Sequence, residues 1–565
     1  MSIEKASDAA ERGPIATITP RMHGTEEPRG MSRFARDLDL PSLGYGGGGS
    51  ASGKFGRMFP DLPPVIHSDA DLTALGTTMV APTQAQPESN IPAVFTYFGQ
   101  FVDHDITLDT TPLPDVERDP LGLTNFRTPA LDLDSVFGGG PKLSPHLYES
   151  DHVTLKVGTT EPARGPNTGD LPRDGAGKAL LGDGRNDENL IVAQLHLSFL
   201  RFYNRIVQRF KDAGTPPLAL FQTARRAAVW HYQWVVVHDF LPRIVGPEVI
   251  TDILDHGRRF YSPTGPKPFM PVEFSVAAYR YGHSMVRQSY KFQVDTDATF
   301  PTASIAQFFT FTELFAAGSP SHTIAGTNWP MRPKDWRSFA ELSPTAPPQG
   351  AAPIDPILAL SLGNLPHGDL SSQPNLAVRN LQRGRFYGLP SGQAVATRMG
   401  VVPLTPTQVA GGRAIPKSVA NLTPLWYYVL REAELVGGGN RLGPVGGRIV
   451  AEVLLGLLDA DPTSYRHCKR IPILPQPFPV PRRLPEFEVV SLLGRFPKAP
   501  LPEVIRPAAR APQFAPAAAA VADIDLRNPE IAEALQIFRC WKPFLGPTPG
   551  VFTLADLLRF ANEGP

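Results

Sequence analysis

The amino-acid sequence predicts a mainly α-helical protein with little β-structure and extended Pro/Gly-rich terminal arms. Apolar residues recur at helical spacing over 188–211, 219–240, 272–288 and 445–458, whereas alternating strand patterns are few. The 62 prolines and 50 glycines gather toward the two ends of the chain rather than in its middle. Because both residues interrupt helices, this distribution favours a helical middle between extended ends.

The chain is expected to form three segments. Residues 1–90 are predicted as an extended N-terminal arm, residues 91–465 as one large domain, and residues 466–565 as a Pro-rich segment whose terminal helices pack on that domain. Those helices are expected over Pro529–Trp541 and from near Thr553. The middle is treated as one unit because its chemical motifs are spread over about 290 positions and must meet in space.

The first motif is the run Phe98–Asp105, which places an amide, two carboxylates and an imidazole within six positions. If this stretch is helical, Gln100 and His104 are four apart and share a face, with Asp103 beside them. Asp105 then points elsewhere and is available for another role. A lone histidine is more often a satisfied core residue. This one has three polar neighbours, which indicates a chemical site.

The second motif is Gly182–Asn189, which leads into the apolar run of a long amphipathic helix. Its Arg185 and Glu188 are therefore expected at or near a helix start. The helix dipole favours an acidic residue there, so capping alone would explain Glu188. It does not explain Arg185, because a cation is disfavoured at that position. Arg185 is accordingly a candidate functional residue.

Two further motifs carry a histidine and an amide. Tyr279–Ser284 carries His283; a neutral imidazole is a common ligand of iron, and its other ring nitrogen then needs an acceptor. The run Asn380–Arg385 offers an amide and two arginines further along the chain. Each arginine alone would more often be a surface cation.

An acidic loop, Thr128–Gly138, carries Asp132 and Asp134 at alternate positions. Crowded oxygen ligands suit a hard cation such as Ca²⁺, which takes about six to eight of them. Acidic loop residues are more often only solvated, so this loop alone is a weak indication of a metal site.

Taken together and in chain order, the five motifs resemble those of the peroxidase–cyclooxygenase superfamily, the animal-type haem peroxidases. The chain is identified as a bacterial-type member. The run FGQFVDHDITLD is similar to the family's distal segment, and the resemblance extends from Gln100 to Arg385, about half of the chain. It implies a large single-domain haem peroxidase fold with haem b as cofactor. It also implies catalytic roles for His104 in proton transfer, for Arg185 in charge stabilisation and for Gln100 at a halide site.

The resemblance further implies how haem is held. His283 matches the axial ligand of the iron, and Asn380 matches the asparagine that accepts a hydrogen bond from its other ring nitrogen. Arg280 and Arg383 match arginines that pair with the haem propionates.

Covalent attachment of haem is implied as well. Asp103 and Glu188 match the two carboxylates that form ester links to haem methyl groups in the family. Asn189 stands where one relative carries the methionine of an additional sulfonium link. Two esters at most, and no sulfonium, are therefore expected. The alternative is that both carboxylates only cap helices or contact solvent.

The acidic loop is similar to the family's calcium loop. The resemblance implies a calcium cage made by Thr128, the carbonyl of Ala130, Asp132 and Asp134, together with Asp105 beside the distal histidine. The family commonly has serine where Asp134 stands, so this chain adds a negative charge to the site.

The implied activity is reduction of hydrogen peroxide through a ferryl haem, with oxidation of halide, thiocyanate or small phenolic donors and a role in the response to oxidative stress. One alternative is a fatty-acid dioxygenase on the same fold. Those relatives place a radical-forming tyrosine three positions before the proximal histidine, where this chain has Arg280, and Tyr279 is one position away. A second alternative is a haem-containing binding or adhesion module.

Composition limits the partners. Lysine and arginine together number 54, as do aspartate and glutamate, so no net charge steers the chain toward nucleic acid or an anionic membrane. The longest apolar stretch, Ala227–Val237, is broken by His231 and Gln233, and no membrane span is expected. The sequence leaves the oligomeric state open.

The N-terminus and the cysteines bear on localisation. The first twelve residues are charged throughout and lack the apolar core of a signal peptide, so cytoplasmic residence or a leaderless export route is expected. Only Cys468 and Cys540 are present, which excludes a disulfide-rich architecture and leaves either one bridge or two thiols.

Overall fold

The fold is mainly α, as predicted. The computed structural model describes residues 53–83, 86–108, 124–125, 127, 129–159, 169–175, 178–187, 189–263, 268–291, 303–304, 323–324, 327–328, 333–343, 345–365, 373–470 and 551–562. Within these residues helices predominate and strands are short.

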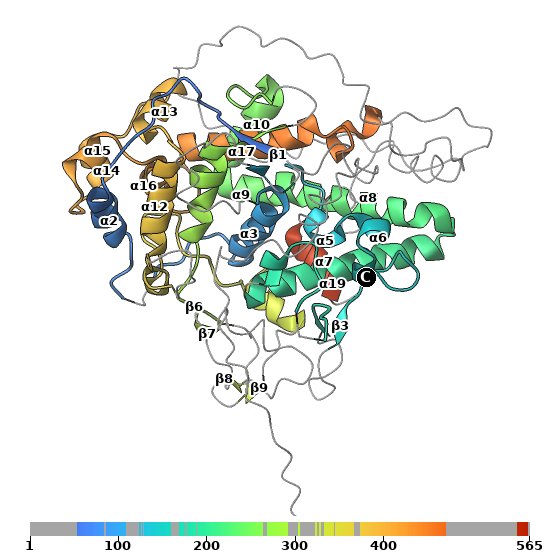
Figure 1. Cartoon of the computed structure of the whole chain (residues 1–565). Coiled ribbons are helices and arrows are strands. Elements are labelled where there is room, and N and C mark those ends of the chain that lie inside the picture. Colours follow the sequence, from blue (N-terminus) through green and yellow to red (C-terminus); the bar gives the residue numbers. More distant parts are fainter. Residues whose placement is uncertain are drawn as a thin grey trace, which may run out of the picture.

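Helix α3 (Val94–Ile106) lies in the middle of the molecule, and the long helix α7 (Leu190–Asp212) packs on it (Figure 1). Phe101 of α3 stacks on Phe199 of α7 with ring centroids 4.5 Å apart. Every residue of α3 is buried except Gln100 and Asp103. The central helix therefore keeps two polar residues partly accessible while the rest of its surface is covered.

Three of the predicted helical patterns have direct counterparts. The pattern over 188–211 forms α7, which begins where Asn189 accepts a hydrogen bond from the Val192 amide at 3.0 Å. The pattern over 219–240 forms α8 (Pro217–Val235) and the π-helix η4 (Val236–Phe240), and α8 packs on α7. The pattern over 445–458 forms α17 (Pro444–Ala460).

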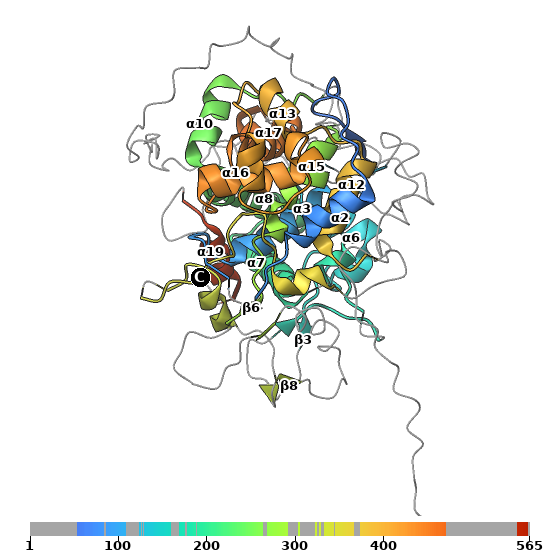
Figure 2. The ribbon, with the colours of Figure 1, turned by 90° about the vertical axis from the view of Figure 1, so that its left-hand side faces the viewer.

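The other helices surround this centre (Figures 1 and 2). They are α2 (Asp69–Thr77), α5 (Asp134–Phe137), α6 (Gly140–Leu143), α9 (Leu241–Val245), α10 (Pro247–His256), α12 (Leu376–Phe386), α13 (Gly392–Arg398), α14 (Pro406–Ala410), α15 (Lys417–Asn421), α16 (Leu425–Gly437) and α19 (Leu554–Asn562). Short 3-10 helices are η1 (Pro145–Leu147), η3 (Gly184–Asp187), η8 (Pro333–Ser338), η9 (Leu360–Gly363) and η10 (Tyr465–Arg470). In both views α2 lies beside α12.

The strands are short and form small sheets. β1 (Gly53–Gly56) is the middle strand of a three-stranded sheet, antiparallel to β2 (Thr124–Asn125) and parallel to β5 (Met270–Pro271). Antiparallel pairs join β3 (Gly158–Thr159) to β4 (Gly169–Asp170), β6 (Ser289–Tyr290) to β7 (Ala303–Ser304) and β8 (Thr323–Ile324) to β9 (Thr327–Asn328). The sheet around β1 ties the start of the described chain to the segment that precedes His283.

The structure corrects the expected extended arm over residues 1–90. From residue 53 onward the chain contributes β1 and α2, and Phe59 and Leu75 belong to the hydrophobic core. The side chain of Ser68 caps α2 by accepting from the Asp71 amide at 3.0 Å. Packing of α2 against α12 and of Phe59 against Phe260 fixes a segment whose proline content alone indicates an extended chain. Residues 1–52 lie outside the described residues.

The segment over 272–288 is helical but differs from the single amphipathic α-helix that was predicted. It consists of the π-helix η5 (Glu273–Ala277) followed by the 3-10 helix η6 (Ala278–His283). The change occurs at Ala277, whose φ of −127° and ψ of −76° are not helical. Such departures from α geometry are frequent at functional sites. Here the 3-10 turn ends at His283.

The last described helix, α19, begins at Leu554 and packs on α7. Phe560 meets Phe202 of α7 edge to face, and Arg201 donates a hydrogen bond to Asn562 at 2.9 Å. The helix predicted over Pro529–Trp541 and the pairing of the two cysteines lie outside the described residues. None of the described helices has the length and apolar character needed to cross a membrane.

Candidate active site

His104 is buried near the C-terminal end of α3, with only 3% of its surface exposed. Its Nδ1 lies 2.8 Å from the side-chain oxygen of Asn186, which belongs to η3. Gln100 is on the same helix one turn earlier, so the predicted shared face is formed. Asn189, the capping residue of α7, donates a hydrogen bond from Nδ2 to Gln100 Oε1 at 3.2 Å.

Arg185 extends from η3 to the end of α3. Its Nη2 donates to the main-chain carbonyl of His104 at 3.0 Å and to that of Thr107 at 2.6 Å. The same nitrogen pairs with Asp183 at 2.8 Å. Within the described part of the chain, the other terminal nitrogen, Nη1, has no hydrogen bond, and the Arg185 side chain is 16% exposed. Arg185 therefore offers one donor beside the histidine helix.

Asp183 lies between two arginines. Besides Arg185 it accepts a hydrogen bond from Nε of Arg127 at 3.0 Å, and both members of this second pair are buried. Burial alone would raise the pKa of Asp183, but the guanidinium groups of Arg127 and Arg185 outweigh it and hold the pKa well below its usual range. Asp183 is therefore ionised and fixes both arginines.

Of the two carboxylates that were predicted to form esters, the structure describes one. Asp103 is partly accessible and accepts a hydrogen bond from the Thr107 hydroxyl at 3.0 Å. Glu188 lies outside the described residues. Its neighbour Asn189 caps α7 and reaches Gln100, so the helix start has a neutral amide cap.

His283, at the end of η6, meets Asn380 of α12 as predicted, with Asn380 Nδ2 2.8 Å from His283 Nδ1. The direction of this hydrogen bond is the reverse of the predicted one. The Asn380 carbonyl accepts a hydrogen bond from Nη1 of Arg280 at 3.0 Å, so the amide nitrogen faces the histidine. Because an amide NH₂ group only donates, His283 Nδ1 is the acceptor in this arrangement.

The two arginines predicted to pair with haem propionates lie on η6 (Arg280) and α12 (Arg383). Arg280 is held by its contact with Asn380 and by a hydrogen bond from Nε to the Ser275 carbonyl at 3.1 Å. Its own carbonyl accepts from the indole of Trp426 at 3.1 Å. The guanidinium of Arg383 lies over the ring of Tyr387, 6.0 Å from its centroid.

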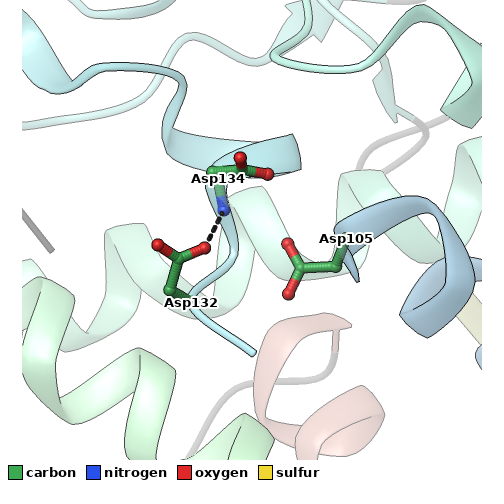
Figure 3. Close-up of side chains that lie close together, drawn as sticks. All are labelled: Asp105, Asp132 and Asp134. Atoms are coloured by element: carbon green, nitrogen blue, oxygen red, sulfur yellow. Dashed lines mark hydrogen bonds between the residues drawn. The ribbon is translucent and has the colours of Figure 1, made fainter. Parts of the chain in front are cut away.

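Three carboxylates gather where α3 meets the acidic loop. Oxygen atoms of Asp105, Asp132 and Asp134 all lie within 4.8 Å of one another, and Figure 3 shows the side chains brought together from α3 and the loop that enters α5. Asp105 is fully buried and accepts hydrogen bonds from the Leu133 amide at 3.1 Å and the Ser135 hydroxyl at 3.3 Å. Thr128 is outside the described residues, and the part of the Ala130 carbonyl stays a prediction.

The electrostatics of this cluster favour a cation. Burial and the charges of Asp134 and Asp132 raise the pKa of Asp105 well above its usual value, and burial with the charge of Asp134 raises that of Asp132 to about 7. Arg127 donates to Asp134 at 2.8 Å, and Arg225 lies 3.8 Å from Asp132. Carboxylates this close repel one another unless protons or a cation intervene.

Arg127 also joins the carboxylate cluster to the segment of Arg185. It contacts Asp134 through Nη1 and the Gly182 carbonyl through Nη2, at 2.8 and 2.9 Å. The fit is close, because a Cβ atom on Gly182 would lie 2.4 Å from the carbonyl oxygen of Asp134. The two motifs therefore pack as one unit.

A profile described as animal haem peroxidase matches residues 113–440, more than half of the chain. The chain belongs to the animal haem peroxidase family. The matched span contains Arg185, His283 and Asn380, while α3 with His104 precedes it.

Similar curated proteins carry peroxidase names. Thyroid peroxidase of Rattus norvegicus is 27% identical over 378 residues, which cover 60% of this chain and 38% of that protein. Chorion peroxidase of Drosophila melanogaster is 24% identical over 405 residues, covering 68% and 47%. A peroxidase-like protein of Margaritifera margaritifera is 29% identical over 253 residues, covering 34% and 31%. The chain thus spans less than half the length of these relatives.

Solved structures agree on the fold. Peroxidase A of Dictyostelium discoideum superimposes with a TM-score of 0.54 at 17% identity, covering 75% of this chain and 92% of that one. A fatty acid alpha-dioxygenase of Arabidopsis thaliana gives 0.53 at 16% identity, covering 76% and 80%. At these identities the likeness shows the fold alone.

Sequence reasoning did not single out Asp183, Asn186 or Arg127. The first two lie inside the Gly182–Asn189 motif, and the structure brings them to Arg185 and His104. A signal for Asp183 was present, because an arginine that enters the interior needs a carboxylate partner. Nothing in the sequence pattern indicated that Arg127 would pair with Asp183 across 56 positions.

Proposed function

We propose that this protein is a haem-dependent peroxidase that reduces hydrogen peroxide and oxidises a halide, thiocyanate or a small phenolic donor. The observation that carries this proposal is the attachment of Arg185 to the carbonyl of His104, in a chain of the animal haem peroxidase family. A proton-transferring imidazole and a cation beside it form the pair of groups that cleavage of a peroxide bond requires.

The described residues fit haem. Helix α3 contacts η6, which brings His104 and His283 to neighbouring elements, and both imidazoles have Nδ1 engaged by an asparagine. Gln100 and Asp103, the partly accessible residues of α3, belong to the same helix as His104 and are polar. His283 would hold the iron, and Arg280 and Arg383 would pair with the propionates.

Ligation through His283 sets a requirement on Asn380. A histidine that binds a metal through Nε2 carries its proton on Nδ1, which then needs an acceptor. The Asn380 amide would therefore turn to present its oxygen to His283, and Arg280 would exchange that oxygen for a haem propionate.

Haem, when bound, supplies the iron at which peroxide reacts and retains the oxidising equivalents that the donor consumes. His104 takes a proton from peroxide and returns it to the departing oxygen. Nη1 of Arg185 stabilises negative charge on that oxygen, because the rest of the guanidinium is already held by Asp183 and by two carbonyls. Gln100, fixed by Asn189, would contact the halide.

The carboxylate cluster is proposed to bind calcium, with Asp105, Asp132 and Asp134 as charged ligands. Their mutual approach and the raised pKa values of Asp105 and Asp132 are the supporting observations. Arg127 already neutralises part of the charge of Asp134, the position at which the family commonly has serine. Since Asp105 follows His104 directly, the cation would fix the end of α3.

The alternative of a fatty-acid dioxygenase has the similar fold in its favour. Against it, Arg280 occupies the position three residues before His283, and its guanidinium is bound to Ser275 and Asn380. Tyr279 stacks on Phe274 at 4.6 Å, and its buried hydroxyl has no hydrogen bond within the described part of the chain.

One set of measurements separates these functions. Purified, haem-loaded protein is given hydrogen peroxide with guaiacol, and in parallel a long-chain fatty acid with oxygen. A peroxidase turns over guaiacol and consumes no oxygen with the fatty acid, whereas a dioxygenase shows the reverse. A binding module would exceed free haemin in neither reaction, and that result would contradict the proposal.

A further inference from the structure

A second buried histidine is connected to His104 through Asn186. The Asn186 side chain places Oδ1 2.8 Å from Nδ1 of His104 and Nδ2 3.0 Å from Nδ1 of His196, which belongs to α7. Asn186 and His196 have no exposed surface, and His104 has 3%. One amide group therefore bridges two imidazoles in the interior of the protein.

The amide couples the proton positions of the two rings. An amide oxygen only accepts, so Nδ1 of His104 carries a proton and its Nε2 is left with a lone pair. An amide nitrogen only donates, so Nδ1 of His196 accepts and its proton is on Nε2. Turning the amide by 180° would reverse both tautomers and place the His104 proton on Nε2, where it would block proton uptake.

His196 can accept the hydrogen bond from the Asn186 amide nitrogen, because its ring is neutral and its Nδ1 lies 3.0 Å away. Burial lowers its pKa to about 3, a shift that the charge of Asp183 opposes and that of His104 reinforces, so the ring is neutral at ordinary pH. Its ring meets Phe101 edge to face at 6.0 Å, and Phe101 is itself stacked on Phe199. The ring therefore has little freedom to rotate.

We propose that Asn186 is a positioning residue that selects the His104 tautomer with an unprotonated Nε2, and that His196 holds the Asn186 amide in the orientation this requires. The inference rests on the proposed function, in which His104 takes up the proton of peroxide. It assigns to His196 a role that acts through Asn186, without contact with substrate.

Cyanide binding tests the tautomer without turnover. Hydrogen cyanide binds ferric haem as the anion and gives its proton to a free imidazole nitrogen, so its association rate reports whether Nε2 of His104 can accept. We expect N186L and H196L to slow cyanide association at least tenfold while haem content and the absorbance spectrum are kept. H196N places an acceptor oxygen where Nδ1 stands and should recover most of the rate. H231L, which removes another fully buried imidazole, serves as the matched control.

A conservative variant distinguishes this role from simple packing. N186D keeps an acceptor oxygen for Nδ1 of His104, whereas N186L removes it at similar volume. Cyanide association at one fixed pH should therefore be faster in N186D than in N186L. A residue that only filled space would give the same rate in both variants.

The outcomes separate the inference from the function on which it rests. If H104L slows cyanide association but N186L and H196L match the unsubstituted protein, the positioning roles are refuted and the proposed function stands. If H104L itself keeps the full rate, His104 is not the proton acceptor, and both fail. Equal slowing by H231L would also reject the inference, because the effect would then be general.

Discussion

Arg185 donates a hydrogen bond from Nη2 to the main-chain carbonyl of His104 across 3.0 Å. Arg185 thus binds the main chain at His104, which fixes its guanidinium relative to the end of α3. Asp183 fixes the other side of the guanidinium and also pairs with buried Arg127. Any change in this chain of ion pairs should therefore alter the position of His104.

The first prediction concerns Asp183. D183N leaves two guanidinium groups without their buried carboxylate, which should lower the free energy of unfolding by about 3–5 kcal/mol. It should also slow the reaction with peroxide at least tenfold, because Arg185 is no longer fixed. Urea unfolding and stopped-flow absorbance measure the two effects.

A double variant separates stability from chemistry. In D183N/R127M the Arg127 charge that lost Asp183 is removed. When the double variant is measured with saturating calcium, which takes over the charge of Asp134, part of the lost stability should return. The slow reaction with peroxide should remain, since Arg185 still lacks its partner. Recovery of both quantities together would show that D183N acts only through unfolding.

The second prediction is that His283 ligates the iron. H283A should lose the native Soret band or shift it to another ligation state, because its imidazole is the proposed axial ligand. Added imidazole should restore the band in H283A. A spectrum identical to that of the unsubstituted protein would refute the assignment of His283 as the iron ligand.

Sequence periodicity was sufficient where neighbours in sequence decide the geometry. It placed Gln100 and His104 on one face of α3 and turned Asp105 away from that face, because helical spacing fixes both. That Asp105 meets Asp132 and Asp134 was implied by the family resemblance, not by periodicity. The contact between Asn186 and His104 joins residues 82 positions apart, and local pattern carries no information on such pairs.

Tertiary packing also decided the elements that differ from expectation. The segment before His283 has apolar residues at helical spacing, but packing of η5 and η6 against α16 and α17 produces π and 3-10 turns instead of an α-helix. Likewise one face of α2 packs against α12, although the prolines around it indicate an extended arm. Proline content constrains the backbone locally but does not determine burial.

The third prediction concerns the cation. Calcium at about a hundred times its dissociation constant should stabilise the folded protein by about 2.7 kcal/mol, so a chelator should lower the thermal midpoint. D132N should abolish both the bound metal and the effect of the chelator. D134S, which installs the residue common in the family, should retain the metal. Metal analysis of active protein that finds no divalent ion would contradict the cage.

The fourth prediction is a pH dependence of stability at Glu432. This buried carboxylate accepts hydrogen bonds from the Val445 and Gly446 amides at the start of α17, and burial raises its pKa to about 7. The usual value is about 4.3, so between about pH 4 and 7 the unfolded chain ionises while the folded protein keeps the proton. Folding stability should therefore fall as the pH rises through this window, by up to about 4 kcal/mol at 1.4 kcal/mol per pKa unit.

The variant E432Q tests the direction of this pH dependence. A glutamine keeps an acceptor for the Val445 amide but cannot ionise, so the thermal midpoint of E432Q should fall less between pH 5 and pH 8 than that of the unsubstituted protein. The titratable neighbour Tyr428 is unchanged in this variant. Parallel pH profiles for the two proteins would exclude Glu432 as the source.

The last prediction is that Asp103 forms an ester with a haem methyl group. Asp103 is partly accessible on the face of α3 that carries His104, and the Thr107 hydroxyl orients its carboxylate at 3.0 Å. Peroxide turnover should attach haem, so that acid–organic extraction leaves part of it on the polypeptide. D103N should release more haem than the unsubstituted protein, because an amide cannot form the link, whereas T107V keeps the carboxylate and should slow attachment without preventing it. Complete extraction of haem from the unsubstituted protein after prolonged turnover would show that Asp103 only binds Thr107 and solvent.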